Sequence, residues 1–245
     1  MGFTVTGGVT FSGGMSFDAP SATPYVTDGL VLYYDPSKSS SYPGSGNTVY
    51  DLSGNGLNGT MTNVSWTSPY FLFNFPTTNA YSSVPDNALL EPGAGSYSIE
   101  IWVSPGLQDG NQYMLCKGPF NTFSDVSYAV TRTFGTVSYS WWASGGTGVQ
   151  NTQVGMTSGT WYQFVYVLSR SPQNLYLYSN SVLARTNSHT LGSINNTATP
   201  LYIGSISGTS SFFAGRIGAL RFYNKALSSA EVTQNWNVTK SLYGY

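Results

Sequence analysis

The stretch GRIGALRFYNKALSSAE, residues 215–231, decides the fold of this chain. Its first nine residues have the length of a strand and are rich in aliphatic and aromatic side chains. Its last four residues place Ser228 at a helix cap and Glu231 three positions later, which is the capping-box pattern. Val232 and Trp236, four residues apart, then share one face of a short helix. The stretch therefore predicts a long strand followed by a short helix that closes the fold.

The chain from residue 29 onward repeats the strand pattern. Segments of strand length rich in aromatic and β-branched residues are GLVLYYD (29–35), SYSIEIWV (96–103), SYAVT (127–131), GTVSYSWW (135–142), TWYQFVYVLS (160–169), NLYLYS (174–179) and PLYIGSI (200–206). Turn clusters such as SGNGLNG and ASGGTG separate them, and no long segment has a helical period. We therefore expect an all-β sandwich of two antiparallel sheets, and we assign residues 25–245 to this one domain.

The composition excludes some classes of protein. Only 8% of the residues are charged, and the formal net charge is −1, so the chain lacks the material for a basic patch and nucleic acid is not an expected partner. Aromatic residues reach 16%, which is unlike a disordered chain. A neutral surface rich in hydroxyl groups and tyrosine suits contact with sugars or with other protein subunits. Cys116 is the single cysteine, so no internal disulfide forms.

Residues 1–24 are interpreted as a separate, glycine-rich assembly arm. The parsing FTVT-GG-VTFS-GG-MSFD predicts three short strands joined by Gly-Gly turns, with Val5 facing Thr10 and Phe11 facing Ser16. The apolar residues of the arm are Phe3, Val5, Met15 and Phe17 on one face and Val9 and Phe11 on the other. A small ribbon cannot bury two apolar faces by itself, so we expect the arm to dock on another subunit. The alternative is a leader without fixed structure.

The chain start shows neither a signal peptide nor a membrane segment. The first basic residue is Lys38, and no unbroken apolar stretch precedes it. No segment has the length of a membrane span. We therefore expect synthesis in the cytoplasm and no membrane partner.

The order of the segments carries a family resemblance. GLVLYYDPS, YDLSGNGLNGT, SYSIEIWVSP, TWYQFVYVLS and the closing motif G-x-I-x-x-x-R-x-Y-N-x-A-L-S-x-x-E follow one another from about Gly29 to Trp236. In this order they resemble the laminin-G-like, concanavalin-A-like jelly-roll family. The form that opens with LVLYYDPS and DLSGNG is similar to domains of bacteriophage and other viral structural proteins. The family also includes sugar-binding modules, adhesion modules and some glycosidases.

Many members of this family bind calcium on the rim of the sandwich, which makes calcium a possible cofactor. The closing strand often carries an Asp after G-x-I, but this chain has Gly218 and Ala219 there, and that departure weakens the implied site. Asp51, with help from Asn55, is the remaining candidate for a metal ligand. The alternative is that Asp51 caps the Gly/Asn turn that follows it. We expect no other cofactor.

The residues favour a protein that is not an enzyme. Glycosidases need two carboxylates close together, about 5 Å apart in retaining enzymes. Glu100 is the only acidic residue inside an apolar strand, and Trp102 stands two positions later, where a second carboxylate could lie. We expect Glu100 to be paired with a hydrogen-bond donor. His189 has no acid or cysteine beside it and is expected in a loop, and Cys116 has no partner histidine in sequence.

The alternation of side chains predicts where a ligand or a neighbouring subunit would bind. Leu175 and Leu177 share one face of their strand, so Tyr176 and Tyr178 lie on the other. Trp142 likewise lies opposite the face of its own strand that holds Val137. Trp142, Tyr176 and Tyr178 are therefore candidates for sugar stacking or for an interface; the alternative is plain surface.

These observations favour a non-enzymatic structural protein on the surface of a virus particle. In this hypothesis it is a capsid decoration protein docked by residues 1–24, with virion proteins and further copies of itself as partners. The first alternative is a tail-fibre or receptor-binding lectin that recognises surface polysaccharides of the host. The second is an enzyme that acts on glycosides.

Overall fold

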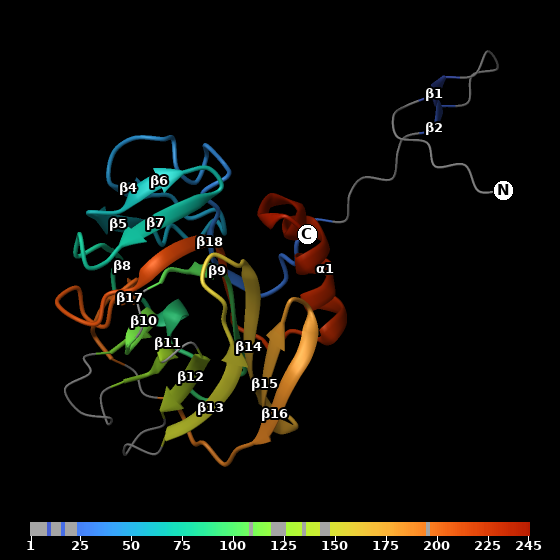
Figure 1. Ribbon diagram of the computed structural model, residues 1–245. Helices are drawn as coiled ribbons and strands as arrows, with labels where there is room; N and C mark the ends of the chain where they lie inside the picture. Colours follow the sequence, from blue (N-terminus) through green and yellow to red (C-terminus); the bar gives the residue numbers. More distant parts are fainter. Residues whose placement is uncertain are drawn as a thin grey trace.

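The computed structural model describes residues 9–10, 16–17, 24–107, 110–118, 126–133, 136–142, 148–194 and 197–245. Within these residues the strands of the main body form two antiparallel sheets packed face to face, and an α-helix lies near the C-terminus (Figure 1). This architecture confirms the predicted all-β sandwich with a short closing helix. None of the described helices has the length and apolar character needed to cross a membrane.

The first sheet, in spatial order, consists of β13 (Gly148–Gly155), β12 (Thr136–Trp142), β11 (Tyr128–Thr133), β10 (Gln112–Lys117), β17 (Leu201–Ile203), β8 (Tyr81–Val84), β5 (Gly59–Thr62) and β4 (Thr48–Val49). The second sheet consists of β16 (Val182–Ser188), β15 (Gln173–Ser179), β14 (Tyr162–Arg170), β9 (Tyr97–Pro105), β18 (Ala214–Tyr223), β7 (Tyr70–Asn74) and β6 (Ser65–Thr67), with β3 (Leu30–Tyr34) paired to β18. The strand part of the stretch quoted first thus belongs to β18, which lies between β9 and β7 in the second sheet.

The main core lies between the two sheets. In β9, for example, Ile99, Ile101 and Val103 point into it and are at most 1% exposed. The alternate residues of the same strand lie on the outer face of the second sheet, which we define as the face turned away from the first sheet. These residues are also buried, because a further layer covers part of that face.

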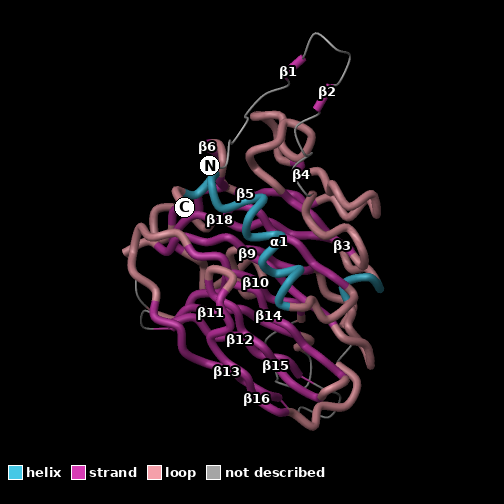
Figure 2. The backbone as a smooth tube through the Cα atoms, turned by 90° about the vertical axis from the view of Figure 1, so that its right-hand side faces the viewer, coloured by secondary structure: helices cyan, strands magenta, loops and turns pink. Residues whose placement is uncertain are grey.

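The covering layer consists of α1 (Ser229–Thr239), the 3₁₀ turn η3 (Lys240–Tyr243) and the segment that precedes β3. Figure 2 shows α1 lying across the second sheet. The predicted capping box of Ser228 and Glu231 is confirmed. Val232 and Trp236 both face the sheet, as the four-residue spacing predicts. A second, smaller 3₁₀ turn, η1 (Ala88–Leu90), connects β8 to β9.

The described part of the N-terminal segment forms a sheet of its own. β1 (Val9–Thr10) and β2 (Ser16–Phe17) pair with each other and with neither sandwich sheet. Thr10 lies opposite Ser16, so the predicted pairing of Phe11 with Ser16 is wrong by one residue. An odd number of residues separates the paired positions Thr10 and Ser16, whereas the predicted two-residue Gly-Gly turn requires an even number. The predicted positions of Phe3, Val5 and Met15 lie outside the described residues.

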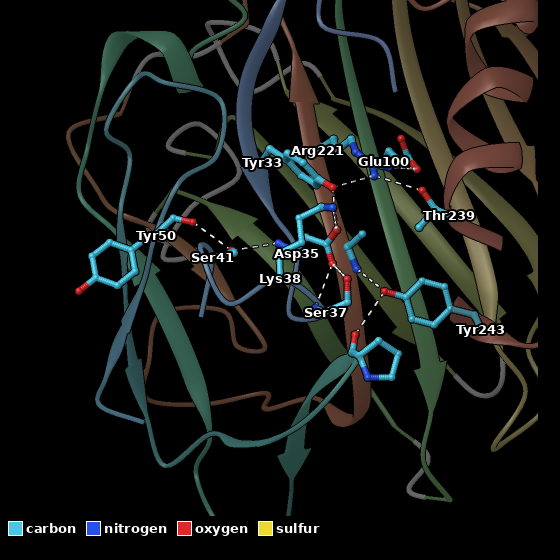
Figure 3. A network of polar contacts seen from close by, with 12 residues as sticks. Tyr33, Asp35, Ser37, Lys38, Ser41, Tyr50, Glu100, Arg221, Thr239 and Tyr243 are labelled. Atoms are coloured by element: carbon cyan, nitrogen blue, oxygen red, sulfur yellow. Dashed lines mark hydrogen bonds and ion pairs between the residues drawn. The ribbon is translucent and has the colours of Figure 1, made fainter. Parts of the chain in front are cut away.

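A buried polar network fills the space between the second sheet and α1 (Figure 3). The Arg221 guanidinium lies 2.8 Å from the Glu100 carboxylate, and both side chains are at most 1% exposed. Arg221 also donates to the hydroxyls of Tyr33 (3.2 Å) and Thr239 (3.1 Å). Burial alone would lower the pKa of Arg221, but the Glu100 carboxylate raises that pKa above its ordinary value. The network therefore holds a buried ion pair of Arg221 and Glu100 beneath the helix.

A second buried cation lies at one end of the sandwich. The Lys117 ammonium is within 2.6 Å of carboxylate oxygens of Asp86 and Glu91. It also donates to the backbone carbonyls of Thr197 (2.8 Å) and Thr199 (2.7 Å), and the Lys117 side chain is completely buried. Four oxygen atoms from two connections, the one between β8 and β9 and the one before β17, thus surround one nitrogen.

Candidate functional site

The predicted ligand residues do not form one site. Tyr176 and Tyr178 do lie opposite the sandwich core, because Leu175 and Leu177 point into it. However, the covering layer packs over them, so Tyr178 is only 7% exposed and Tyr176 is half-buried. Burial of the Tyr178 ring leaves it no room to stack on a sugar, which is one of the roles considered for it from the sequence. Trp142 ends β12 in the other sheet, and its side chain lies outside the described residues.

The candidate metal ligands form a turn. The Asp51 carboxylate accepts hydrogen bonds from the backbone N–H groups of Tyr33 (2.9 Å), Ser53 (2.9 Å) and Leu57 (3.1 Å), and from the Ser53 hydroxyl (2.7 Å). Asn55 directs its amide nitrogen at a backbone carbonyl of β3 (2.9 Å). Donors of the chain already occupy the oxygen atoms that calcium would need. This geometry fits the turn-capping alternative and does not fit a calcium site.

The residues considered for catalysis are buried and engaged in structural contacts. Besides Arg221, the Glu100 carboxylate accepts from the side-chain amides of Gln163 (2.9 Å) and Asn235 (2.7 Å), which confirms the expected pairing with donors. His189 follows β16 in a loop, where its Nε2 lies 2.9 Å from a backbone carbonyl. Burial raises the pKa of the Cys116 thiol to about 12. None of these three side chains is open to a substrate.

The second sheet carries an open hollow on the part of its outer face that α1 and η3 leave uncovered. The hollow has a volume of about 330 Å³, which is within the range of small-molecule sites. Residues of β7, β9 and β18 form its floor, and the loops after β9 and before β14 form its walls. Its lining includes Leu72, Asn74, Ser104, Leu107, Gly159 and Arg216.

Strand register explains why these residues meet. Arg216 of β18 lies directly opposite Ser104 of β9 on one side and opposite Leu72 of β7 on the other. Directly opposed residues of antiparallel strands place their side chains on the same face, about 5 Å apart at Cβ. The neighbouring residues Ile217 and Phe71 point into the core. The row of Ser104, Arg216 and Leu72 therefore faces outward together.

Arg216 is the chemically prominent group of the hollow. Its guanidinium carbon lies 5.1 Å from the centre of the Tyr70 ring, so the ring supports the flat guanidinium from one side. The side chain is half-buried. Among the described residues no hydrogen-bond acceptor or carboxylate pairs with it. Its N–H groups are therefore available to a ligand.

Two further features suit a polar ring-shaped ligand. The Ser104 side chain is 1% exposed, and its hydroxyl has no hydrogen-bond partner among the described residues. Tyr70 packs against Trp161 with ring centres 5.8 Å apart, and both side chains are half-buried. Hydroxyl and guanidinium groups beside aromatic faces can bind a sugar by hydrogen bonding and stacking.

The hollow as a whole has no signature in the sequence. The one available signal was the alternation in GRIGALRFY and PYFLFNF, which turns Arg216, Tyr70 and Leu72 away from the core residues beside them. The alternation could not show that β7, β9 and β18 are neighbours. It also could not show where the C-terminal cover ends.

A comparison with protein families identifies the fold group. Residues 76–233, more than half of the chain, match the model described as the concanavalin A-like lectin/glucanases superfamily. The chain belongs to this superfamily. The match agrees with the resemblance found in the sequence. No curated protein matches the chain at a significant level.

Solved structures with a similar fold include binding domains of toxins. The binding domain of Paraclostridial Mosquitocidal Protein 1 is similar with a TM-score of 0.71 and 17% identity, over 89% of this chain and 55% of that one. The binding domain of botulinum neurotoxin serotype G has a TM-score of 0.67 and 14% identity, over 86% of this chain and 51% of that one. The serotype D binding domain has a TM-score of 0.68 and 12% identity, over 87% and 52%.

The chain therefore spans about half the length of these toxin domains. At such low identity the similarity shows the fold alone. The similar structures give no support to the virus particle expected from the sequence, and that assignment stays a prediction.

Proposed function

We propose that this protein is a non-enzymatic carbohydrate-binding module and that the hollow on the second sheet is its sugar site. The observation that carries the proposal is the unpaired Arg216 guanidinium supported by the Tyr70 ring at the edge of an open hollow. Glycan sites combine a few oriented polar groups with an aromatic face. The superfamily, which includes lectins by its own description, and the fold shared with toxin binding domains support a binding role.

The test is binding of the purified full-length chain to an array of microbial polysaccharides, with calcium and with a chelator. Tyr70→Ala should weaken binding about tenfold, because it removes the ring that supports Arg216, a residue of the hollow's lining. Tyr50→Ala is the matched control, since Tyr50 is 45% exposed and, unlike Tyr70, is not a ring that supports Arg216. Circular dichroism should show that both variants remain folded.

The outcomes distinguish a sugar site in the hollow from one at Trp142, which the sequence predicts as a candidate. If Trp142→Ala abolishes binding while Tyr70→Ala does not change it, the sugar site lies at the end of β12 and the assignment to the hollow is wrong. If the wild-type chain binds no polysaccharide in either buffer, the proposed function is wrong.

We also propose, from the N-terminal segment, attachment to a virus particle as a decoration protein. Its support is that β1 and β2 pair only with each other among the described strands, as expected for an arm that is separate from the sandwich. The same arm could anchor a receptor-binding lectin, so this role is compatible with the sugar site.

Deletion of residues 2–23 tests the arm. Circular dichroism should show an intact sandwich, while sedimentation velocity should show loss of the self-association expected of an assembly arm. An unchanged oligomeric state after the deletion would contradict a role of the arm in assembly.

A further inference from the structure

We infer that the hollow selects acidic sugars and that Arg216 binds their carboxylate group. The inference rests on the proposed sugar-binding function and adds the class of ligand. It also adds a specificity-determining residue.

The distribution of charge supports this inference first. The described carboxylates already have partners elsewhere: Asp28 and Glu231 with Lys225, Asp35 with Tyr33 and Ser37, Asp51 with its turn, Asp86 and Glu91 with Lys117, and Glu100 with Arg221. None of these seven side chains lines the hollow. The charge of Arg216 therefore has no counterpart in the described part of the chain.

The geometry of Arg216 favours a planar anion. A guanidinium presents two parallel N–H groups that match the two oxygens of a carboxylate. The position of the guanidinium over the Tyr70 ring limits the movement of the Arg216 side chain before a ligand arrives. A pre-oriented donor of this kind loses less conformational entropy on binding than a free side chain.

Ser104 lies where a second contact to the same ligand is needed. It is directly opposite Arg216 on the next strand, and its hydroxyl is buried without a partner. A buried hydroxyl without a hydrogen bond is unfavourable, so a ligand that supplies an acceptor or a donor there gains affinity. The carboxylate and an adjacent ring hydroxyl of a sugar acid provide both.

The experiment compares acidic polysaccharides with their carboxyl-reduced forms. The panel consists of polygalacturonate, alginate, hyaluronan and polysialic acid, each beside its neutral reduced counterpart, with dextran sulfate as a different anion. We expect at least one acidic form to bind about tenfold or more tightly than its reduced form. Dextran sulfate should bind less tightly than that carboxylate polymer.

Variants of Arg216 identify the responsible group. Arg216→Gln should remove the preference for the acidic form, so that the acidic and the reduced form bind this variant with equal affinity. Arg216→Lys should keep only part of the wild-type preference for the acidic form, because an ammonium cannot make the bidentate contact. Arg185→Gln, at a side chain that is exposed and outside the hollow, is the matched control and should have no effect.

Failure of the inference is distinguishable from failure of the proposed function. Equal binding of acidic and reduced forms, with loss of both in Tyr70→Ala, would overturn the selection of acids and leave the sugar site standing. An acid preference that survives Arg216→Gln would overturn the role of Arg216. Tighter binding of dextran sulfate than of any carboxylate polymer would replace the carboxylate with a sulfate. Absence of binding to every polymer, neutral ones included, would overturn both proposals.

Discussion

At the scale of single residues, Gly218 explains a departure of this chain from its family. The resemblance implies an Asp near this position, but the sequence has Gly218 and Ala219. The structure places the Tyr243 hydroxyl there, 2.7 Å from the Ala219 N–H that donates to it. A Cβ on Gly218 would lie 2.1 Å from that hydroxyl. Position 218 lacks a side chain because the Tyr243 hydroxyl occupies the space.

Gly218→Ala should destabilise the protein by about 1–3 kcal/mol, because the new methyl group displaces Tyr243 or shifts β18. Urea denaturation followed by tryptophan fluorescence measures the effect. Gly192→Ala is the matched control, since a Cβ there meets no atom within 4 Å, and it should change stability by less than about 0.5 kcal/mol. Equal stability of the two variants would show that Tyr243 does not fill this space in solution.

At the scale of elements, α1 connects the C-terminal part of the domain to the segment that precedes β3. Asn235 accepts a hydrogen bond from the Val26 backbone (2.8 Å) and donates to Glu100. At the start of the helix, Lys225 bridges Asp28 (2.6 Å) and Glu231 (2.7 Å). The helix therefore fixes the segment before β3 as well as covering the second sheet.

The helix start gives a pH dependence. Partial burial pushes the pKa of Glu231 upward, but hydrogen bonds from Lys225 and Ser228 outweigh it and hold that pKa below its ordinary value. A carboxyl with a lowered folded-state pKa stabilises the fold above its unfolded pKa, and this stabilisation is lost as the pH falls through the folded pKa. Glu231→Gln should therefore be about 0.5–1 kcal/mol less stable than wild type near neutral pH.

Thermal melts of both proteins from about pH 7 down to about pH 3 check this expectation, because both carboxyl states are sampled in that range. The difference between the melting temperatures should shrink toward the acidic end. A difference that stays constant over the whole range would mean that the charge of Glu231 does not contribute.

At the scale of the whole molecule, the outer face of the second sheet is divided into two parts. Along β9, Trp102 is stacked beneath Trp236 and Tyr243, whereas Ser104, two residues further, lines the hollow. The C-terminus therefore determines both the buried and the open part of one sheet face. A ligand in the hollow would rest beside the aromatic side chains that close the fold.

The sequence was sufficient for the architecture and insufficient for the site. Alternation and the capping box depend on neighbours along the chain, so the strands, the faces of Leu175 and Tyr176, and the start of α1 could be predicted. The hollow depends on the lateral order of β7, β9 and β18 and on the end of the covering layer. Neither property has a local pattern, and for the same reason the burial of Tyr178 was missed.

The cage around Lys117 has a consequence for how the protein depends on its surroundings. Two carboxylates and two carbonyls are a set of oxygen atoms that a dissolved divalent ion could also use. Here the positive charge is part of the Lys117 side chain, so it stays beside these oxygen atoms as long as the chain is folded. Dilution, dialysis or a chelator cannot remove it. The counter-charge at this end of the sandwich therefore does not depend on the concentration of free cations.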